Sequence, residues 1–215
     1  MKKFELTTNT KMFLGKKLFQ IKALISFGDV KAGELGGYIE KEENLSQTGD
    51  AWVFDNARVT DNAWVTDNAW VSGDAWVSGN ARVTDNAWVT DNARVTDNAW
   101  VSGDAWVSGN ARVTDNAWVS DNARVSDNAR VSGDAWVSDN ACYTTIKGFG
   151  REYRTTTFFR CKDGKVRVQC GCFYGDLKEF RAIVKKTHGK SKKAKEYLMI
   201  ADLMELHFEE KKNDK

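Results

Sequence analysis

The chain has 215 residues, of which 41% are hydrophobic and 29% are charged, and its formal net charge is +2. This composition excludes a disordered chain, and no apolar run is long enough to span a membrane. The two lysines near the N-terminus are not followed by an apolar stretch, so we expect no signal peptide and a cytoplasmic protein. Four cysteines are too few for a disulfide scaffold in a chain of this length.

The charge is unevenly distributed along the chain. Residues 1–48 carry +2, residues 49–144 have six Arg against fourteen Asp, and residues 145–215 have eighteen Lys or Arg against ten acidic residues. A basic end beside an acidic array indicates either an anionic partner for the basic part or docking of that part against the array.

Residues 1–36 predict a small β cap at the N-terminal end. A hairpin is expected between residues 12 and 24, with its turn at Gly15-Lys16. Such a cap would cover the unpaired strand edge that an open solenoid exposes. Coiling is expected to begin near Gly37, because Ile39 and Leu45 are six residues apart.

Residues 49–144 form sixteen consecutive hexads that read turn, turn, Ala, variable residue, Val and, in most hexads, Thr or Ser; the last hexad has Tyr143 in place of Val. Ala and Val are two residues apart, so on an extended segment their side chains point to the same side. The variable residue is Trp or Arg until Cys142 and points to the opposite side. The pairs between these segments are turn dipeptides. Because one hexad cannot bury its Ala and Val alone, the pattern predicts a stacked solenoid.

Val59 is followed four places on by Ala63, and the same spacing recurs along the array. In this the chain resembles the bacterial hexapeptide-repeat proteins. The resemblance implies a left-handed parallel β-helix of triangular section, with three hexads per coil and about five coils. We therefore expect a mainly β protein with the β-helix at residues 37–145. The absence of proline suits strands that need every backbone N–H.

Three hexads per coil place residues 18 apart on one face, which sorts the outward side chains into three columns. The first column holds Trp52, Trp70, Trp88, Trp106 and Arg124. The second holds Arg58, Trp76, Arg94, Arg112 and Arg130. The third holds Trp64, Arg82, Trp100, Trp118 and Trp136. Two faces thus carry Trp and one carries Arg.

Exposed aromatic columns of this size are typical of an interface. Our candidate binding residues are therefore Trp52, Trp70, Trp88, Trp106, Trp64, Trp100, Trp118, Trp136, Arg58, Arg94, Arg112 and Arg130. Stacked Trp rings that only join neighbouring coils are the alternative. Two different Trp faces favour a homo-oligomer, most simply a cyclic trimer that packs the first face against the third, with a dimer as the alternative.

Residues 146–215 predict a second end unit, made of a β-hairpin and two helices. The hairpin is expected around Asp163-Gly164, with Cys161, Cys170 and Cys172 on one apolar face. Their spacing lacks the C-x-x-C pairs of structural zinc sites, so we predict buried thiols and no metal or cofactor. Asp176 and Ser191 are the expected N-caps of the two helices.

Gly189-Lys190-Ser191 is similar to the end of a phosphate loop, but Val184 stands where that motif has its first glycine. The segment is therefore a candidate anion site at the N-terminus of a helix and not a phosphate loop. The site would consist of Lys190, Ser191, Lys192 and Lys193. A solvated basic turn is the alternative.

The segment from Phe27 to Leu45, the hexad array, and the end unit with Cys170-Gly171-Cys172-Phe173 together resemble proteins encoded by phages and prophages of Gram-positive bacteria. The resemblance implies a phage origin without fixing an activity. We expect a non-enzymatic protein that binds a host protein or a small nucleotide-type ligand, with counter-defence as the role. The net charge of −8 on the hexads argues against duplex nucleic acid as the partner. The alternatives are an acyltransferase, for which His188 and His207 are the only histidines, and a structural spacer or virion part.

Overall fold

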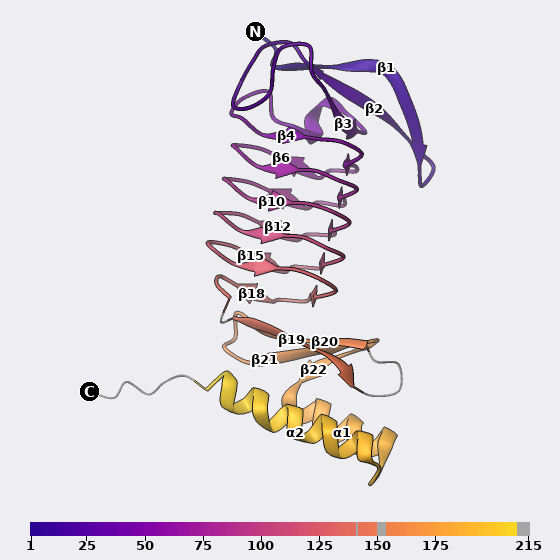
Figure 1. The fold of residues 1–215 in the computed structure, drawn as a ribbon, viewed down its shortest axis with the longest axis vertical. Helices are drawn as coiled ribbons and strands as arrows, with labels where there is room; N and C mark the ends of the chain where they lie inside the picture. Colours follow the sequence, from indigo (N-terminus) through magenta and orange to yellow (C-terminus); the bar gives the residue numbers. More distant parts are fainter. Residues whose placement is uncertain (141, 150–153, 210–215) are drawn as a thin grey trace, which may run out of the picture.

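The computed structural model describes residues 1–140, 142–149 and 154–209. Figure 1 shows a stack of coils with a β-hairpin at one end and an antiparallel sheet with two helices at the other. The coils form parallel sheets and the end unit an antiparallel one, so the mainly β solenoid expected from the hexads is confirmed. Ala141, which belongs to the last hexad, lies outside the described residues.

Each coil gives one short strand to each of three parallel sheets, which we call faces 1, 2 and 3. Face 1 contains β4 (Trp52–Val53), β7 (Trp70–Val71), β10 (Trp88–Val89), β13 (Trp106–Val107) and β16 (Arg124–Val125). Face 2 contains β3 (Leu35–Ile39), β5 (Arg58–Val59), β8 (Trp76–Val77), β11 (Arg94–Val95), β14 (Arg112–Val113) and β17 (Arg130–Val131). Face 3 contains β6 (Trp64–Val65), β9 (Arg82–Val83), β12 (Trp100–Val101), β15 (Trp118–Val119) and β18 (Trp136–Val137).

An irregular coil precedes the hexads and raises the number of turns to about six, as the six solenoid strands of face 2 show. It consists of β3, the 3-10 turn η1 (Glu42–Asn44), and a parallel bridge between Leu45 and Val65. Ile39 pairs with Val59 and is fully buried, so it takes the place of a hexad valine. The coil is irregular because eight residues, not six, separate Leu45 from Val53.

The interior of the solenoid is built from the Ala and Val of every hexad up to Val137, all fully or almost fully buried. The corners follow from the turn dipeptides. Asp91 has φ of 60° and Gly79 has φ of 69°, a left-handed conformation that Asp and Gly tolerate better than other residues. At Gly79 a Cβ would also lie 2.8 Å from the backbone of Asp97 in the next coil. Close coil stacking therefore selects the small corner residues.

The N-terminal hairpin consists of β1 (Phe4–Phe13) and β2 (Lys16–Ala23). Its turn is Leu14-Gly15, one residue earlier than expected, and both residues have positive φ. Strand β2 pairs antiparallel with β3, so the hairpin extends the sheet of face 2 and covers its edge.

The C-terminal sheet has the order β19 (Tyr143–Phe149), β20 (Arg154–Arg160), β21 (Val166–Cys170) and β22 (Phe173–Asp176). The expected hairpin is β20–β21, and the two outer strands were not predicted. Strand β20 lies against the last coil, where Cys161 bridges to Ala135 and the Thr157 hydroxyl accepts the N–H of Arg130 at 2.9 Å. The sheet therefore closes the second end of the solenoid.

The prediction of a single apolar face with all three cysteines is wrong. Phe158 pairs with Val168, so three residues, not two, join the strands around Asp163-Gly164. This odd loop length separates Phe159 and Cys161, which face the solenoid, from Val168, which packs with the helices.

Two helices cover the outer side of this sheet: α1 (Leu177–His188) and α2 (Lys192–His207). The Asp176 carboxylate caps α1 by accepting the N–H of Glu179 at 2.8 Å, and Ser191 caps α2. Both predicted N-caps are confirmed. No helix in the described part of the chain is long and apolar enough to cross a membrane.

Candidate functional site

The three columns of outward side chains have the register predicted from the sequence. Trp88 pairs with Trp70 and with Trp106 on face 1. Arg112 pairs with Arg94 and Arg130 on face 2. Residues 18 apart are therefore neighbours, and each column runs along the solenoid at the strand spacing of about 4.8 Å.

On face 1 the indole rings form a ladder. The rings of Trp70 and Trp88 are stacked with centroids 5.3 Å apart and planes 8° apart, and the ring of Trp106 follows at 5.7 Å from Trp88, tilted by 58°. At the N-terminal end of the ladder, the ring of Phe54 lies 4.7 Å from that of Trp70. At the other end, the Arg124 guanidinium lies over the ring of Trp106 at 5.6 Å. The ladder thus ends in an aromatic ring on one side and a cation on the other.

Face 3 carries a second ladder, further along the axis. Trp100 and Trp118 are stacked at 5.1 Å and 9°, and Trp118 and Trp136 at 5.9 Å and 13°. Each such pair contributes about 0.5–1.5 kcal/mol beyond area burial. The ladders therefore stabilise the stack of coils, as the alternative in which Trp rings join neighbouring coils expects. Rings that stack in this way can still bind a partner.

Hydroxyl groups hold several indoles in place. The indole N–H groups of Trp100, Trp106 and Trp118 donate to the Oγ atoms of Thr84, Thr90 and Ser102 at 3.0–3.2 Å. Each acceptor lies 16 residues earlier in the chain. The hexad Thr or Ser thus has a role that the sequence analysis missed: it satisfies the polar edge of the ring and fixes its orientation.

Five of the tryptophans keep much of their surface in solvent. Their exposed fractions lie between 37% and 44% for Trp64, Trp88, Trp100, Trp106 and Trp136. Rings held by stacking and hydrogen bonds lose little freedom when a partner covers them. Faces 1 and 3 therefore present ordered apolar surface.

Trp52 departs from the expectation that every column tryptophan is exposed. It is fully buried, because Phe4 and Phe27 of the N-terminal cap pack edge-on against its ring at 6.2 and 5.4 Å. Its indole nitrogen has no hydrogen-bond partner in the described part of the chain. Trp52 is a core residue of the cap, since the cap folds over the first coil of face 1.

Face 2 is covered at its N-terminal end. Phe13, at the tip of the hairpin, lies 4.5 Å from the guanidinium of Arg58 and 5.3 Å from the ring of Trp76. The Arg58 guanidinium also donates to the carbonyl of Asp74 at 2.7 Å. Arg58 is therefore half-buried and engaged, whereas Arg94, Arg112 and Arg130 are exposed.

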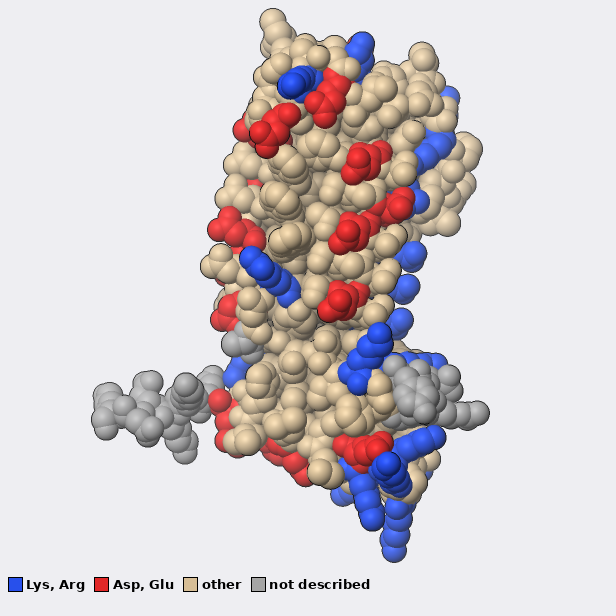
Figure 2. All heavy atoms as spheres, in the orientation of Figure 1, with Lys and Arg blue, Asp and Glu red and all other residues tan. Residues whose placement is uncertain are grey.

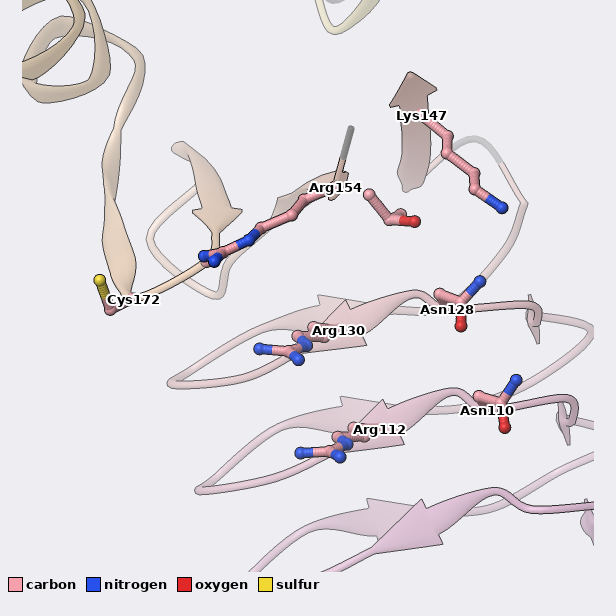
Figure 3. A pocket seen from close by; sticks show the side chains of 9 residues that line it. Asn110, Arg112, Asn128, Arg130, Lys147, Arg154 and Cys172 are labelled. Atoms are coloured by element: carbon pink, nitrogen blue, oxygen red, sulfur yellow. The ribbon is translucent and has the colours of Figure 1, made fainter. Parts of the chain in front are cut away.

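Arg112 and Arg130 also line a cavity of about 580 Å³ between face 2 and the C-terminal sheet. Figure 3 shows them on successive coils, with Lys147 and Arg154 on the strands that face them. Sequence reasoning missed Lys147, Arg154 and Thr155 as lining residues. No local signal marks them, because only the docking of β20 on the last coil brings them to the Arg column.

All four residues of the predicted anion site, Lys190, Ser191, Lys192 and Lys193, are exposed. The Ser191 oxygen already accepts the N–H of Ala194, and the Lys192 amine lies 3.7 Å from Glu196. These contacts are those of an ordinary helix start.

The two histidines lie on the C-terminal helices, and the ring of His188 is stacked 5.9 Å from that of Tyr197. Within residues 1–140, 142–149 and 154–209, no group of three or more His, Cys, Asp or Glu side chains is arranged to hold a metal ion. Burial raises the pKa of the Cys161 thiol, which keeps this thiol protonated at neutral pH.

Three stretches of the chain, residues 75–90, 105–121 and 123–139, match the family model of the YdcK β-solenoid repeat. All three lie within the hexad array and include strands of all three faces. No curated protein matches the chain. The comparison therefore supports a β-solenoid repeat.

Proposed function

We propose that this protein is a non-enzymatic binding protein that self-associates through the Trp columns of faces 1 and 3. The observation that carries the proposal is the order of Trp and Arg along the two faces. Each coil contributes one outward residue to each face. Because the chain climbs along the axis by about one third of the strand spacing per hexad, each face 1 residue lies in height between the face 3 residue six places before it and the one twelve places after it. Trp70 lies between Trp64 and Arg82, Trp88 between Arg82 and Trp100, Trp106 between Trp100 and Trp118, and Arg124 between Trp118 and Trp136.

Copies related by a rotation axis parallel to the solenoid meet at equal levels. If face 1 of one copy packs on face 3 of the next, Arg82 and Arg124 each lie opposite Trp residues, and Trp106 lies opposite Trp residues only. Arg over Trp is a favourable cation–π contact, and like charges do not meet. Three copies form the smallest ring in which every copy uses both faces.

Packing a face against itself about the same axis is less favourable. Arg82 would then meet Arg82 on face 3, and Arg124 would meet Arg124 on face 1. Like charges opposed at an interface are destabilising. Among assemblies whose axis runs parallel to the solenoid, the sequence order therefore favours contact between two different faces, as the trimer hypothesis requires.

We further propose that the assembled protein is a phage product that acts in the host cytoplasm, in counter-defence, by binding a host component. The support is the resemblance of the N-terminal segment, the array and the end unit to phage-encoded proteins. Face 2, with Arg94, stays free in the ring and is the surface left for such a partner. Capture from phage-infected host lysate, compared with uninfected lysate, tests this part.

The mass of the particle in solution tests self-association. We expect native mass spectrometry to give three times the chain mass of 24.2 kDa, and the double variant Trp88→Ala, Trp106→Ala to be monomeric. Trp76→Ala is the matched control, since it changes a tryptophan of the same hexad position on face 2. A monomeric wild type, or equal loss of association in the control, would refute the proposal.

Thioester hydrolysis or acyl transfer that disappears in His188→Ala would instead support the acyltransferase alternative. If the solenoid serves only as a structural spacer, a folded variant with both Trp88 and Trp106 replaced would still act as the spacer.

A further inference from the structure

The cavity at the end of face 2 is made from two separate parts of the chain. The solenoid supplies Asn110, Arg112, Asn128 and Arg130, and the C-terminal unit supplies Lys147, Arg154, Thr155, Gly171 and Cys172. Its volume of about 580 Å³ lies within the range of small-molecule sites, about 300–1,000 Å³.

Four cationic side chains line this cavity, and no carboxylate does so among the described lining residues. Other arginines of the C-terminal unit are paired: Arg167 with Asp163 at 2.7 Å, and Arg181 with Asp202 at 2.8 Å. In the described part of the chain, Arg112 and Arg130 form no ion pair. Among the described residues, the cavity thus concentrates positive charge without a neutralising ion pair.

The Arg column adds to this charge. Arg94, Arg112 and Arg130 are in register on adjacent strands, so like charges follow one another at about 4.8 Å. Partial burial, and then the neighbouring Arg130 and Arg94, lower the pKa of Arg112. A bound anion would relieve this repulsion.

The turn between β21 and β22 leaves room for one of the cations. Gly171 has φ of +63°, and a Cβ on it would lie 2.7 Å from Nη1 of Arg154. The missing side chain lets the guanidinium lie across the turn at the cavity wall. The amides of Asn110 and Asn128 and the hydroxyl of Thr155 add neutral donors.

We infer that this cavity binds a compact anion that carries two or more phosphate groups. Two guanidiniums on the solenoid, and one guanidinium and one amine on the sheet, surround it from both sides, and guanidinium groups bind phosphate through two parallel hydrogen bonds. One phosphate group cannot engage all four cations, whereas a chain of phosphates can. The inference does not rest on self-association, because face 2 takes no part in that contact.

Isothermal titration calorimetry with the full chain tests the site, with tripolyphosphate, ATP, orthophosphate and adenosine as probes. We expect tripolyphosphate and ATP to bind at least about ten-fold more tightly than orthophosphate, and adenosine not to bind. Equal affinity for tripolyphosphate and ATP identifies the phosphate chain as the ligand, and tighter binding of ATP identifies a nucleotide.

The double variant Arg112→Gln, Arg154→Gln should weaken tripolyphosphate binding by about 30-fold or more, since it removes two charge-assisted contacts. The double variant Lys185→Gln, Lys186→Gln is the matched control, because it removes the same charge from exposed sites on α1 that do not line the cavity. Its affinity should stay within about two-fold of the wild type. Circular dichroism monitors the fold of each variant.

Three results would overturn the inference. They are no binding of tripolyphosphate or ATP at millimolar concentration, equal weakening by Lys185→Gln, Lys186→Gln, and undiminished affinity in a folded Arg112→Gln, Arg154→Gln variant.

Discussion

The same residue type at the same hexad position has different roles, depending on whether residues of another segment cover its side chain. Trp52 and Trp88 occupy equivalent places on face 1, but cap residues bury Trp52 completely, and Trp88 keeps 42% of its surface exposed. The hexad pattern predicts only that both point outward. Which of them is covered depends on the path of the N-terminal segment, and no repeat encodes that path.

We expect Trp52→Ala to lower the free energy of unfolding by about 3–5 kcal/mol, because it leaves a cavity between Phe4 and Phe27 that the cap cannot fill. Trp64→Ala, at an exposed site two hexads further on, should cost much less. Urea denaturation followed by far-ultraviolet circular dichroism measures both. Equal effects of the two substitutions would show that the cap does not enclose Trp52.

A buried lysine at the same end predicts a pH dependence. Lys3 is 2% exposed, and its amine donates to the carbonyls of Ala51 and Gly49 at 2.9 and 3.2 Å. Burial, opposed in part by Asp50, lowers the pKa of Lys3 from 10.5 to about 8. Between these two values the unfolded chain binds more protons than the folded chain, so stability rises with pH.

Relative to Lys3→Met, the wild type should therefore gain stability between pH 8 and pH 10.5, by at most about 1.4 kcal/mol per pH unit. Urea titrations of both proteins at several pH values give this difference, and comparison with the variant cancels the titration of all other groups. A constant difference across this range would mean that Lys3 keeps an ordinary pKa.

At the scale of elements, the hexad repeat predicts the features that arise within one coil. It does not predict the contacts between the solenoid and the end units. The strands, corners and columns follow from six residues, and the helix caps at Asp176 and Ser191 follow from local chemistry. The predicted apolar face of the C-terminal hairpin is wrong, because a loop of three residues instead of two changes which side chains lie on the same side of the sheet. The cavity on face 2 could not be predicted, since it forms only where Thr157 and Arg130 join sheet and coil.

Deletion of residues 85–102 removes one whole coil and should leave the solenoid folded, with Trp70 stacked on Trp106 and self-association retained. Deletion of residues 91–96 is the matched control: it removes one hexad and no tryptophan, but it places Arg112 above Trp88. Both variants should melt cooperatively, because every hexad buries the same Ala and Val. Unfolding of the first variant, or unchanged assembly of the second, would contradict a period of 18 residues.

The whole molecule combines an acidic solenoid with a basic end unit. Figure 2 shows acidic side chains spaced along the coils, and Lys and Arg gathered over the C-terminal unit. The Asp residues occur at the corners, so the flat Trp faces between them carry little charge of their own. This distribution keeps the corners solvated and leaves faces 1 and 3 as apolar surfaces, as a face-to-face assembly requires.

Native mass spectrometry of two variants, alone and mixed, tests most directly the proposal that faces 1 and 3 bind each other and not themselves. One variant is Trp88→Ala, Trp106→Ala on face 1, and the other is Trp100→Ala, Trp118→Ala on face 3. Each alone should be monomeric at about 24 kDa, and an equimolar mixture should form a one-to-one dimer, since each partner keeps the face that the other lacks. Assembly of either variant alone, or a mixture that remains monomeric, would contradict the account.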